Sequence, residues 1–171
     1  MKKQIVYPLL IPRIFSTTID LFILTVISMI PMNLLASYVF MWSYKPYFVA
    51  NNITTLNNYE IPDLMNNSSE FIPYLTVTAF LTNIAIMLTL YLLVFGCYFI
   101  GFWHYKSATP GKMIMRMKIV DAETFGPPSL AQLIKRFFGY LLFAIGLWSI
   151  VFSKKRQALH DKIASTVVIK S

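Results

Sequence analysis

The sequence predicts an all-α, multi-pass membrane protein, and three observations support this prediction. Of the 171 residues, 57% are hydrophobic and only 13% are Asp, Glu, Lys or Arg, against about 25% in typical soluble domains. The apolar residues form long blocks, two of which exceed the roughly 20 residues needed to cross a bilayer. Basic residues flank these blocks, as topology determinants do. The length fits a single compact membrane domain over residues 1–171.

Two full transmembrane helices are expected, at about residues 12–44 and 71–103. The first follows a short basic lead that resembles the start of a signal peptide. However, Arg13 interrupts its apolar run and no small-residue cleavage site follows, so we expect an uncleaved membrane helix. The second block contains no charged residue.

A third apolar segment, residues 137–152, is short for a straight crossing. It follows the expected start of a helix near Leu130, with Ser129 as the cap. The tail after the segment is basic, and the loop at 45–70 is mainly acidic. The positive-inside rule therefore favours a re-entrant segment with both termini inside, while a full third crossing is the alternative. We expect a cell (inner) membrane protein with a cytoplasmic amino terminus.

Two short segments on the inner side predict a cytosolic β-hairpin-like pair, at residues 113–120 and 165–170. The first reads MIMRMKIV, in which apolar and basic side chains alternate with the period of two that is typical of a half-buried strand. The second, STVVIK, is interpreted as a short strand. We expect the two to pair with each other.

The net charge of +8 does not indicate a nucleic-acid partner, because the basic residues flank apolar blocks and are attracted equally well by anionic lipids. The expected partner is the lipid bilayer. Three apolar segments are few to surround a pathway across the membrane. We therefore expect that a homo-oligomer is needed to enclose one. The residues expected at lipid headgroups are Lys112, Lys154, Lys155 and Arg156.

Arg13 and Asp20 lie two helical turns apart and therefore share one face of the first helix. If the hydrocarbon begins near Ile11, Asp20 lies about 13 Å deep, where a charge costs at least about 2.5–3.5 kcal/mol. Asp20 is a candidate proton or cation acceptor, and a structural, hydrogen-bonded aspartate is the alternative. We expect Asn83, at a similar depth, as its neighbour. Arg13 is expected either to pair with Asp20 or, as we favour, to reach the interface.

His160 and Asp161 resemble the paired ligands of phosphohydrolases. The only other histidine is His104, so a metal site with a normal number of ligands is not supported. A network that joins Asp161 to a basic neighbour such as Arg136 is the favoured interpretation. The T-P-G-K segment that ends at Lys112 lacks the features of a phosphate-binding loop. No nucleophile with a matching base occurs in a recognisable motif, and we expect neither an enzyme nor a cofactor.

Four features together resemble the RDD family of membrane proteins: Arg13 at the head of the first helix, Asp20 within it, T-P-G-K at 109–112, and R-Q-A-L-H-D-x-x-A-x-T at 156–166. The family is named for one arginine and two aspartates, which the resemblance assigns to Arg13, Asp20 and Asp161. It implies a small multi-pass membrane domain and no settled activity, although proposals lean toward transport. The acidic, Asn-rich loop at 45–70 departs from the family pattern.

Two functions follow from these observations as hypotheses. The first is a transporter of ions or small solutes, in which Asp20 takes up a proton or cation. The second is a non-transporting interaction or assembly module, whose basic cytosolic face docks a membrane or cytosolic protein partner. The residues singled out as functional are Arg13, Asp20, Asn83, Arg136, His160 and Asp161.

Overall fold

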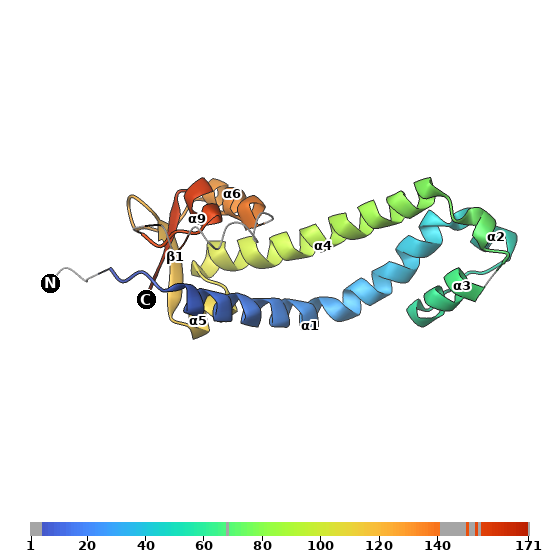
Figure 1. Cartoon of the computed structure of the whole chain (residues 1–171), viewed down its shortest axis with the longest axis horizontal. Coiled ribbons are helices and arrows are strands. Elements are labelled where there is room, and N and C mark those ends of the chain that lie inside the picture. The colour runs from blue at the N-terminus through green and yellow to red at the C-terminus, as the bar shows by residue number, and fades with distance from the viewer. Residues whose placement is uncertain (1–4, 68, 141–149, 151–152, 154, 171) are drawn as a thin grey trace. The chain divides into compact units, whose positions relative to one another are not determined.

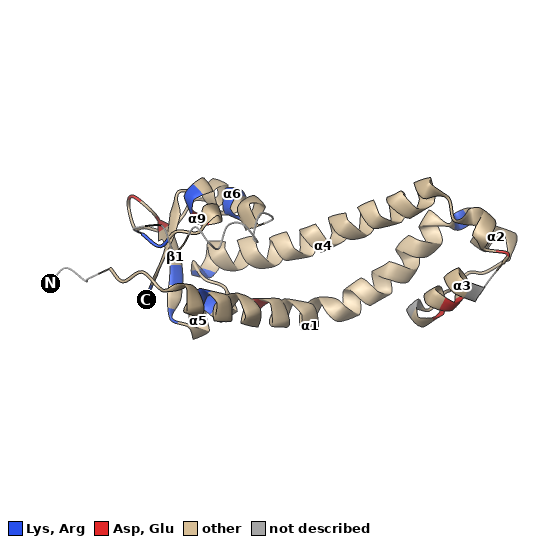
Figure 2. Ribbon diagram, viewed as in Figure 1, with Lys and Arg blue, Asp and Glu red and all other residues tan. Residues whose placement is uncertain are grey.

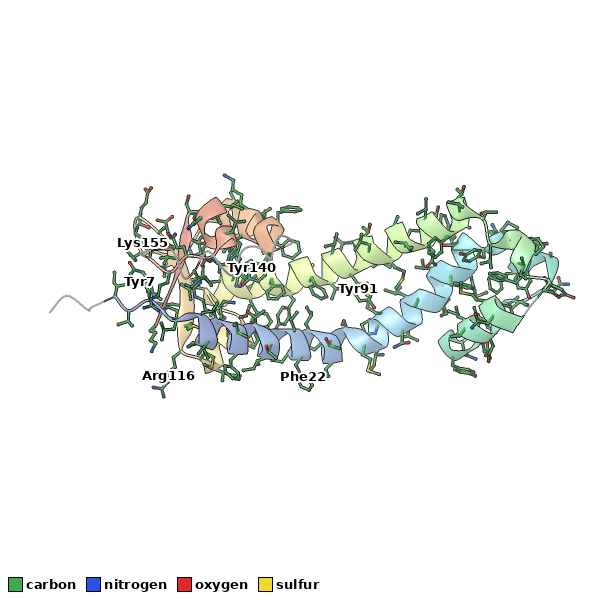
Figure 3. All side chains as sticks on the ribbon, in the orientation of Figure 1. Tyr7, Phe22, Tyr91, Arg116, Tyr140 and Lys155 are labelled. Carbon is green, nitrogen blue, oxygen red and sulfur yellow. The ribbon has the colours of Figure 1, made fainter. Side chains whose placement is uncertain are left out.

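The computed structural model describes residues 5–67, 69–140, 150, 153 and 155–170, and most of them are helical (Figure 1). Two helices are long and apolar enough to cross a membrane, α1 (Leu10–Ser43) and α4 (Val77–Lys106). They confirm the two predicted membrane-length helices. Apolar side chains cover much of their outer surface; Phe22, for example, is 69% exposed and points away from α1 (Figure 3).

The second helix begins later than predicted. Residues 71–103 were expected to form it, but a 3-10 turn, η2 (Ile72–Tyr74), precedes α4. Pro73 lies in this turn, and the side chain of Thr76 accepts a hydrogen bond from the backbone N–H of Ala79 at 3.2 Å. Thr76 therefore caps the helix and fixes where it starts.

The chain divides into two compact units. Unit 1 comprises residues 1–24 and 95–171, and unit 2 comprises residues 25–94. The two membrane-length helices contribute to both units. A single membrane domain over residues 1–171 stays a prediction.

Unit 2 contains an aromatic core formed by Phe40, Tyr44, Tyr47, Phe48 and Phe71. Their rings meet mostly edge to face, with centroids 4.8–6.1 Å apart, as aromatic pairs prefer. The short elements around this core are α2 (Lys45–Ala50), η1 (Asn58–Glu60) and α3 (Ile61–Asn67). Acidic residues of this unit include Glu60 of η1 and Asp63 of α3, and Figure 2 shows acidic positions on α3.

Unit 1 contains a two-stranded antiparallel sheet. Strand β1 (Met117–Asp121) pairs with β2 (Thr166–Lys170), and Ile119 lies opposite Val168. The predicted strand pair is therefore confirmed, but its first strand is shorter than 113–120. The residues before it form α5 (Pro110–Ile114), because a proline is tolerated in the first turn of a helix.

Two further helices of unit 1 pack beside the sheet, α6 (Leu130–Tyr140) and α9 (Leu159–Ile163). The side chain of Ser129 accepts a hydrogen bond from the Gln132 N–H, and the Gln132 side chain accepts one from the Ser129 N–H. This capping box confirms the predicted helix start. The predicted apolar segment 137–152 begins in α6. Its course at 141–149 and 151–152 lies outside the described residues.

Candidate functional site

A buried ionic cluster in unit 1 joins three distant parts of the chain. Asp161, at the start of α9, is fully buried and lies between two arginines. Nη1 of Arg13, from α1, donates to its Oδ2 at 2.6 Å. Nη1 of Arg136, from α6, lies 2.5 Å from its Oδ1. The predicted Asp161–Arg136 contact is confirmed, and the cluster carries one net positive charge.

Further contacts fix both Asp161 and Arg136. The Asp161 carboxylate accepts a hydrogen bond from the Ala158 N–H at 3.0 Å, so it also caps α9. Arg136 donates to Thr166 Oγ1 at 2.7 Å, and its guanidinium lies 5.2 Å from the centre of the Trp103 ring. Burial acts to raise the pKa of Asp161, but the charges of Arg136 and Arg13 outweigh it and lower the pKa below its usual range. The carboxylate is therefore ionised.

Asp20 forms a second buried polar cluster, in which its donors are neutral. Its Oδ2 accepts from Thr109 Oγ1 at 2.5 Å, and its Oδ1 accepts from the Gly111 N–H at 2.7 Å. The Tyr98 hydroxyl donates to Oδ1 at 3.3 Å. Asp20 thus ties α1 to α4 and to the turn that opens α5.

The structure gives Arg13 and Asn83 partners that differ from those predicted. Arg13 was expected to reach the interface or to pair with Asp20, but it is 5% exposed and pairs with Asp161. Asn83 was expected beside Asp20, but its amide donates to Ser43 Oγ at 3.5 Å within unit 2. Both predictions of contacts were wrong because similar depth and helix face do not determine which side chains meet.

A small cavity of about 10 Å³ lies between these clusters and the sheet, large enough for about one water-sized occupant. Three of the side chains around it are basic, and no carboxylate is among the described residues that line it. Lys112 is 3% exposed, and its Nζ donates to the Tyr140 hydroxyl at 3.3 Å. The lining residues are Arg13, Thr17, Lys112, Arg136, Tyr140, Ile150, His160 and Val168.

Comparison with known families shows to which family the chain belongs. The sequence model of the RDD family matches residues 7–165, nearly the whole chain. The chain belongs to the RDD family. An uncharacterized protein of Rickettsia prowazekii (strain Madrid E) is 48% identical over 176 aligned residues that cover all of both chains. No solved structure matches this RDD protein.

Membership of the RDD family and the two membrane-length apolar helices identify the chain as a membrane protein. The resemblance assigns the arginine and two aspartates for which the family is named to Arg13, Asp161 and Asp20. Arg13 and Asp161 form one ion pair, and Asp20 accepts hydrogen bonds from neutral donors. Among the described residues, no three His, Cys, Asp or Glu side chains are grouped to hold a metal ion.

His160 of this RDD protein lies beside the ionic cluster in neutral form. Its ring centre is 4.2 Å from that of Tyr140 (Figure 3). Tyr140 is the last residue of α6, and its ring packs against Phe99 and Trp103 of α4. Its Nε2 is 3.5 Å from Asp161 Oδ1. Burial lowers the pKa of His160 to about 3; Arg136, Lys112 and Arg13 lower it too, whereas Asp161 acts to raise it.

We expect acid to destabilise the protein through His160. An unfolded histidine binds a proton below about pH 6.5, but the folded one does not until about pH 3. The contribution of neutral His160 to the free energy of unfolding is therefore fully present above about pH 6.5. It is lost as the pH falls below this value, by up to about 1.4 kcal/mol per pH unit. Thermal unfolding between pH 7 and 5 should show this slope, and His160→Gln should flatten it.

The matched control for this measurement is His104→Gln, because His104 is exposed on α4. This variant should keep the slope of the parent protein. A parent slope that His160→Gln leaves unchanged would contradict the assignment of the slope to His160.

The four residues predicted at lipid headgroups differ in how far they are exposed to solvent. Lys112 is buried, so it is not presented to headgroups. Lys155 is exposed (Figure 3), and its Nζ donates to the Ala122 carbonyl at 3.0 Å. Arg156 is partly exposed, and Lys154 lies outside the described residues. Lys and Arg occur on α5, β1, α6 and α9 of unit 1 (Figure 2).

The neutral residues that hold the charged ones were not predicted from the sequence. Thr109 and Gly111 bind Asp20, and Trp103 and Tyr140 pack on Arg136. The T-P-G-K segment contained the only signal for the first two, since a threonine followed by a proline opens a helix. Nothing in the sequence linked this helix to Asp20.

Proposed function

We propose that this membrane protein moves ions or small solutes, and that Asp20 takes up a proton or cation during the transport cycle. The observation that supports this proposal is the buried Asp20 carboxylate on a helix of membrane length. An ionisable side chain at membrane depth is costly. Its three donors are all neutral in the described part of the chain.

A proton on Asp20 would change the contacts of α5. An ionised carboxylate only accepts hydrogen bonds, whereas a protonated one also donates. Protonation would therefore leave Thr109 Oγ1 or the Gly111 N–H without a full acceptor. In this proposal the turn at 109–111 loosens when Asp20 is protonated, and this couples proton uptake to movement of α5.

Asp20→Asn is expected to abolish ion or solute flux in proteoliposomes while the protein still inserts. Asparagine keeps the size of the side chain but cannot take up a proton. Flux of protons, Na⁺ and K⁺ should be measured in reconstituted vesicles, together with the fraction of protein that inserts. Glu123→Gln is the control, because Glu123 is an exposed acid of unit 1 and its loss should leave the flux unchanged.

Unchanged flux in Asp20→Asn, or no flux for the wild-type protein with any ion tested, would contradict the transport proposal. In that case we propose the alternative, an assembly module that docks a protein partner. The exposed cations Arg116 and Lys118 favour such a docking face. A homo-oligomer that encloses the transport pathway is part of the transport proposal, and the docking alternative does not require one.

We further propose a cell (inner) membrane location with the amino terminus in the cytoplasm, supported by the basic residues of unit 1. Cysteine labelling tests this orientation. In a chain without Cys97, a cysteine in place of exposed Thr55 should react with an impermeant reagent from outside the cell. A cysteine in place of exposed Lys170 should react only after permeabilisation. The reverse labelling pattern would contradict the orientation.

A further inference from the structure

The polar groups around the small cavity of unit 1 are not balanced in charge. Arg13, Lys112 and Arg136 all line it, and Asp161 is the one carboxylate that pairs with any of them in the described part of the chain. Lys112 has the Tyr140 hydroxyl as its hydrogen-bond acceptor. Three buried cations line the cavity and one carboxylate pairs with two of them, while the nearby Asp20 accepts hydrogen bonds from neutral donors only, among the residues described. Positive charge is therefore in excess at this place, since His160 is neutral.

Several donors at the cavity also lack an acceptor. Nε and Nη2 of Arg13, and the same two atoms of Arg136, are buried without a hydrogen-bond partner among the described residues. The two side chains are 6% and 0% exposed. A buried N–H of a charged group that makes no hydrogen bond destabilises the fold, because it has lost its contact with water and gained no acceptor. A bound acceptor with a negative charge would balance the excess of positive charge and would accept hydrogen bonds from the unpaired donors.

We propose that the cavity is a binding site for one small anion of chloride size. Arginine and lysine, in buried form, present only donors and positive charge. The cavity holds about one water-sized occupant, and chloride is only slightly larger than water. This small volume favours a monatomic anion over a phosphate or carboxylate group. This anion site does not depend on whether the protein transports, and nothing in the transport proposal requires it.

Lys112 is the residue through which the site can be tested. Arg13 and Arg136 both pair with Asp161, so replacing either one would disturb the fold as well as the cavity. Lys112 forms no ion pair in the described residues, and its ammonium lies 5.9 Å from the centre of the Tyr140 ring. Lys112→Gln therefore removes one cation from the cavity and leaves the arginine–aspartate contacts in place.

The experiment compares the full chain, purified in detergent, in sodium chloride and in sodium gluconate at one ionic strength. Chloride should raise Tm in a saturable way, and equilibrium dialysis with radiolabelled chloride should find one bound ion per chain. In Lys112→Gln the apparent Kd should rise by about tenfold to a hundredfold, the loss expected for one charge-assisted hydrogen bond. Lys135→Gln, an exposed lysine of α6, should bind as the parent does.

Equal Tm in both salts together with no bound chloride would overturn the proposal and leave a water in the cavity. An equal loss in Lys135→Gln and Lys112→Gln would also overturn it, because the effect would then follow net charge. If phosphate rather than chloride gives the shift that depends on Lys112, the site takes a larger oxyanion and the chloride assignment is wrong. If Lys112→Gln fails to fold, the dialysis result on the parent protein decides the matter.

Discussion

Asp161→Asn is expected to destabilise the folded protein by about 3–5 kcal/mol, the cost of breaking a buried ion pair from one side. The asparagine fills nearly the same space, but Arg13 and Arg136 then share no counter-charge in the described structure. Their burial makes this severe, because neither guanidinium can turn to water in the folded state. A loss of this size is a large part of the about 5–15 kcal/mol that stabilises a typical domain.

Denaturant unfolding of the purified protein in detergent would measure the Asp161→Asn effect. Asp63→Asn is the matched control, since Asp63 is an exposed acid on α3 and its loss should change stability by less than about 0.5 kcal/mol. If both variants unfold at the same denaturant concentration, the ionic cluster does not stabilise unit 1 in the way described.

Gly111→Ala is expected to have an effect of similar size, for a steric reason. A Cβ added at Gly111 would lie 2.1 Å from the Ser16 carbonyl oxygen and 2.9 Å from Asp20 Oδ1. Both contacts are too close, and the first is to backbone, so α1 and α5 must move apart. The hydrogen bond from the Gly111 N–H to Asp20 is then lost as well. Overpacking and the lost bond to a charged group together cost about 3–5 kcal/mol.

Gly101→Ala separates this steric effect from the general effect of replacing glycine. A Cβ at Gly101, within α4, meets no atom within 4 Å. Its helix should gain up to about 1 kcal/mol, because alanine favours a helix over glycine. The Tm values of both variants, measured by thermal unfolding, should be compared. A Gly111→Ala variant as stable as Gly101→Ala would show that α5 does not hold its place against α1.

Local sequence patterns were sufficient for the long helices, the strand pair and the start of α6, but not for the short helices or the buried contacts. Hydropathy located α1 and α4, the alternating pattern located β1, and Ser129 located the start of α6. Each of these signals lies within a few residues of the structure that it predicts. The late start of α4 was missed because the apolar block continues through the turn before it.

The partners of the charged residues could be predicted only where chemistry left few choices. Asp161 needs a buried cation, so the contact with Arg136 followed from charge. Arg13 could satisfy the same need, but 148 positions separate it from Asp161 and no periodic pattern connects them. For Asp20, an amide on the other membrane helix was a reasonable partner. The structure uses Thr109 and Gly111 of a nearby turn instead.

The ion pair that joins Arg13 to Asp161 has a consequence for biogenesis. Arg13 leaves the ribosome 148 residues before its carboxylate partner. During synthesis and insertion, α1 therefore carries a charged Arg13 before its counter-ion Asp161 has been synthesised. Headgroups, water or the insertion machinery must accommodate that charge in the interval. The polar interior of unit 1 is therefore complete only after residue 161 has been synthesised.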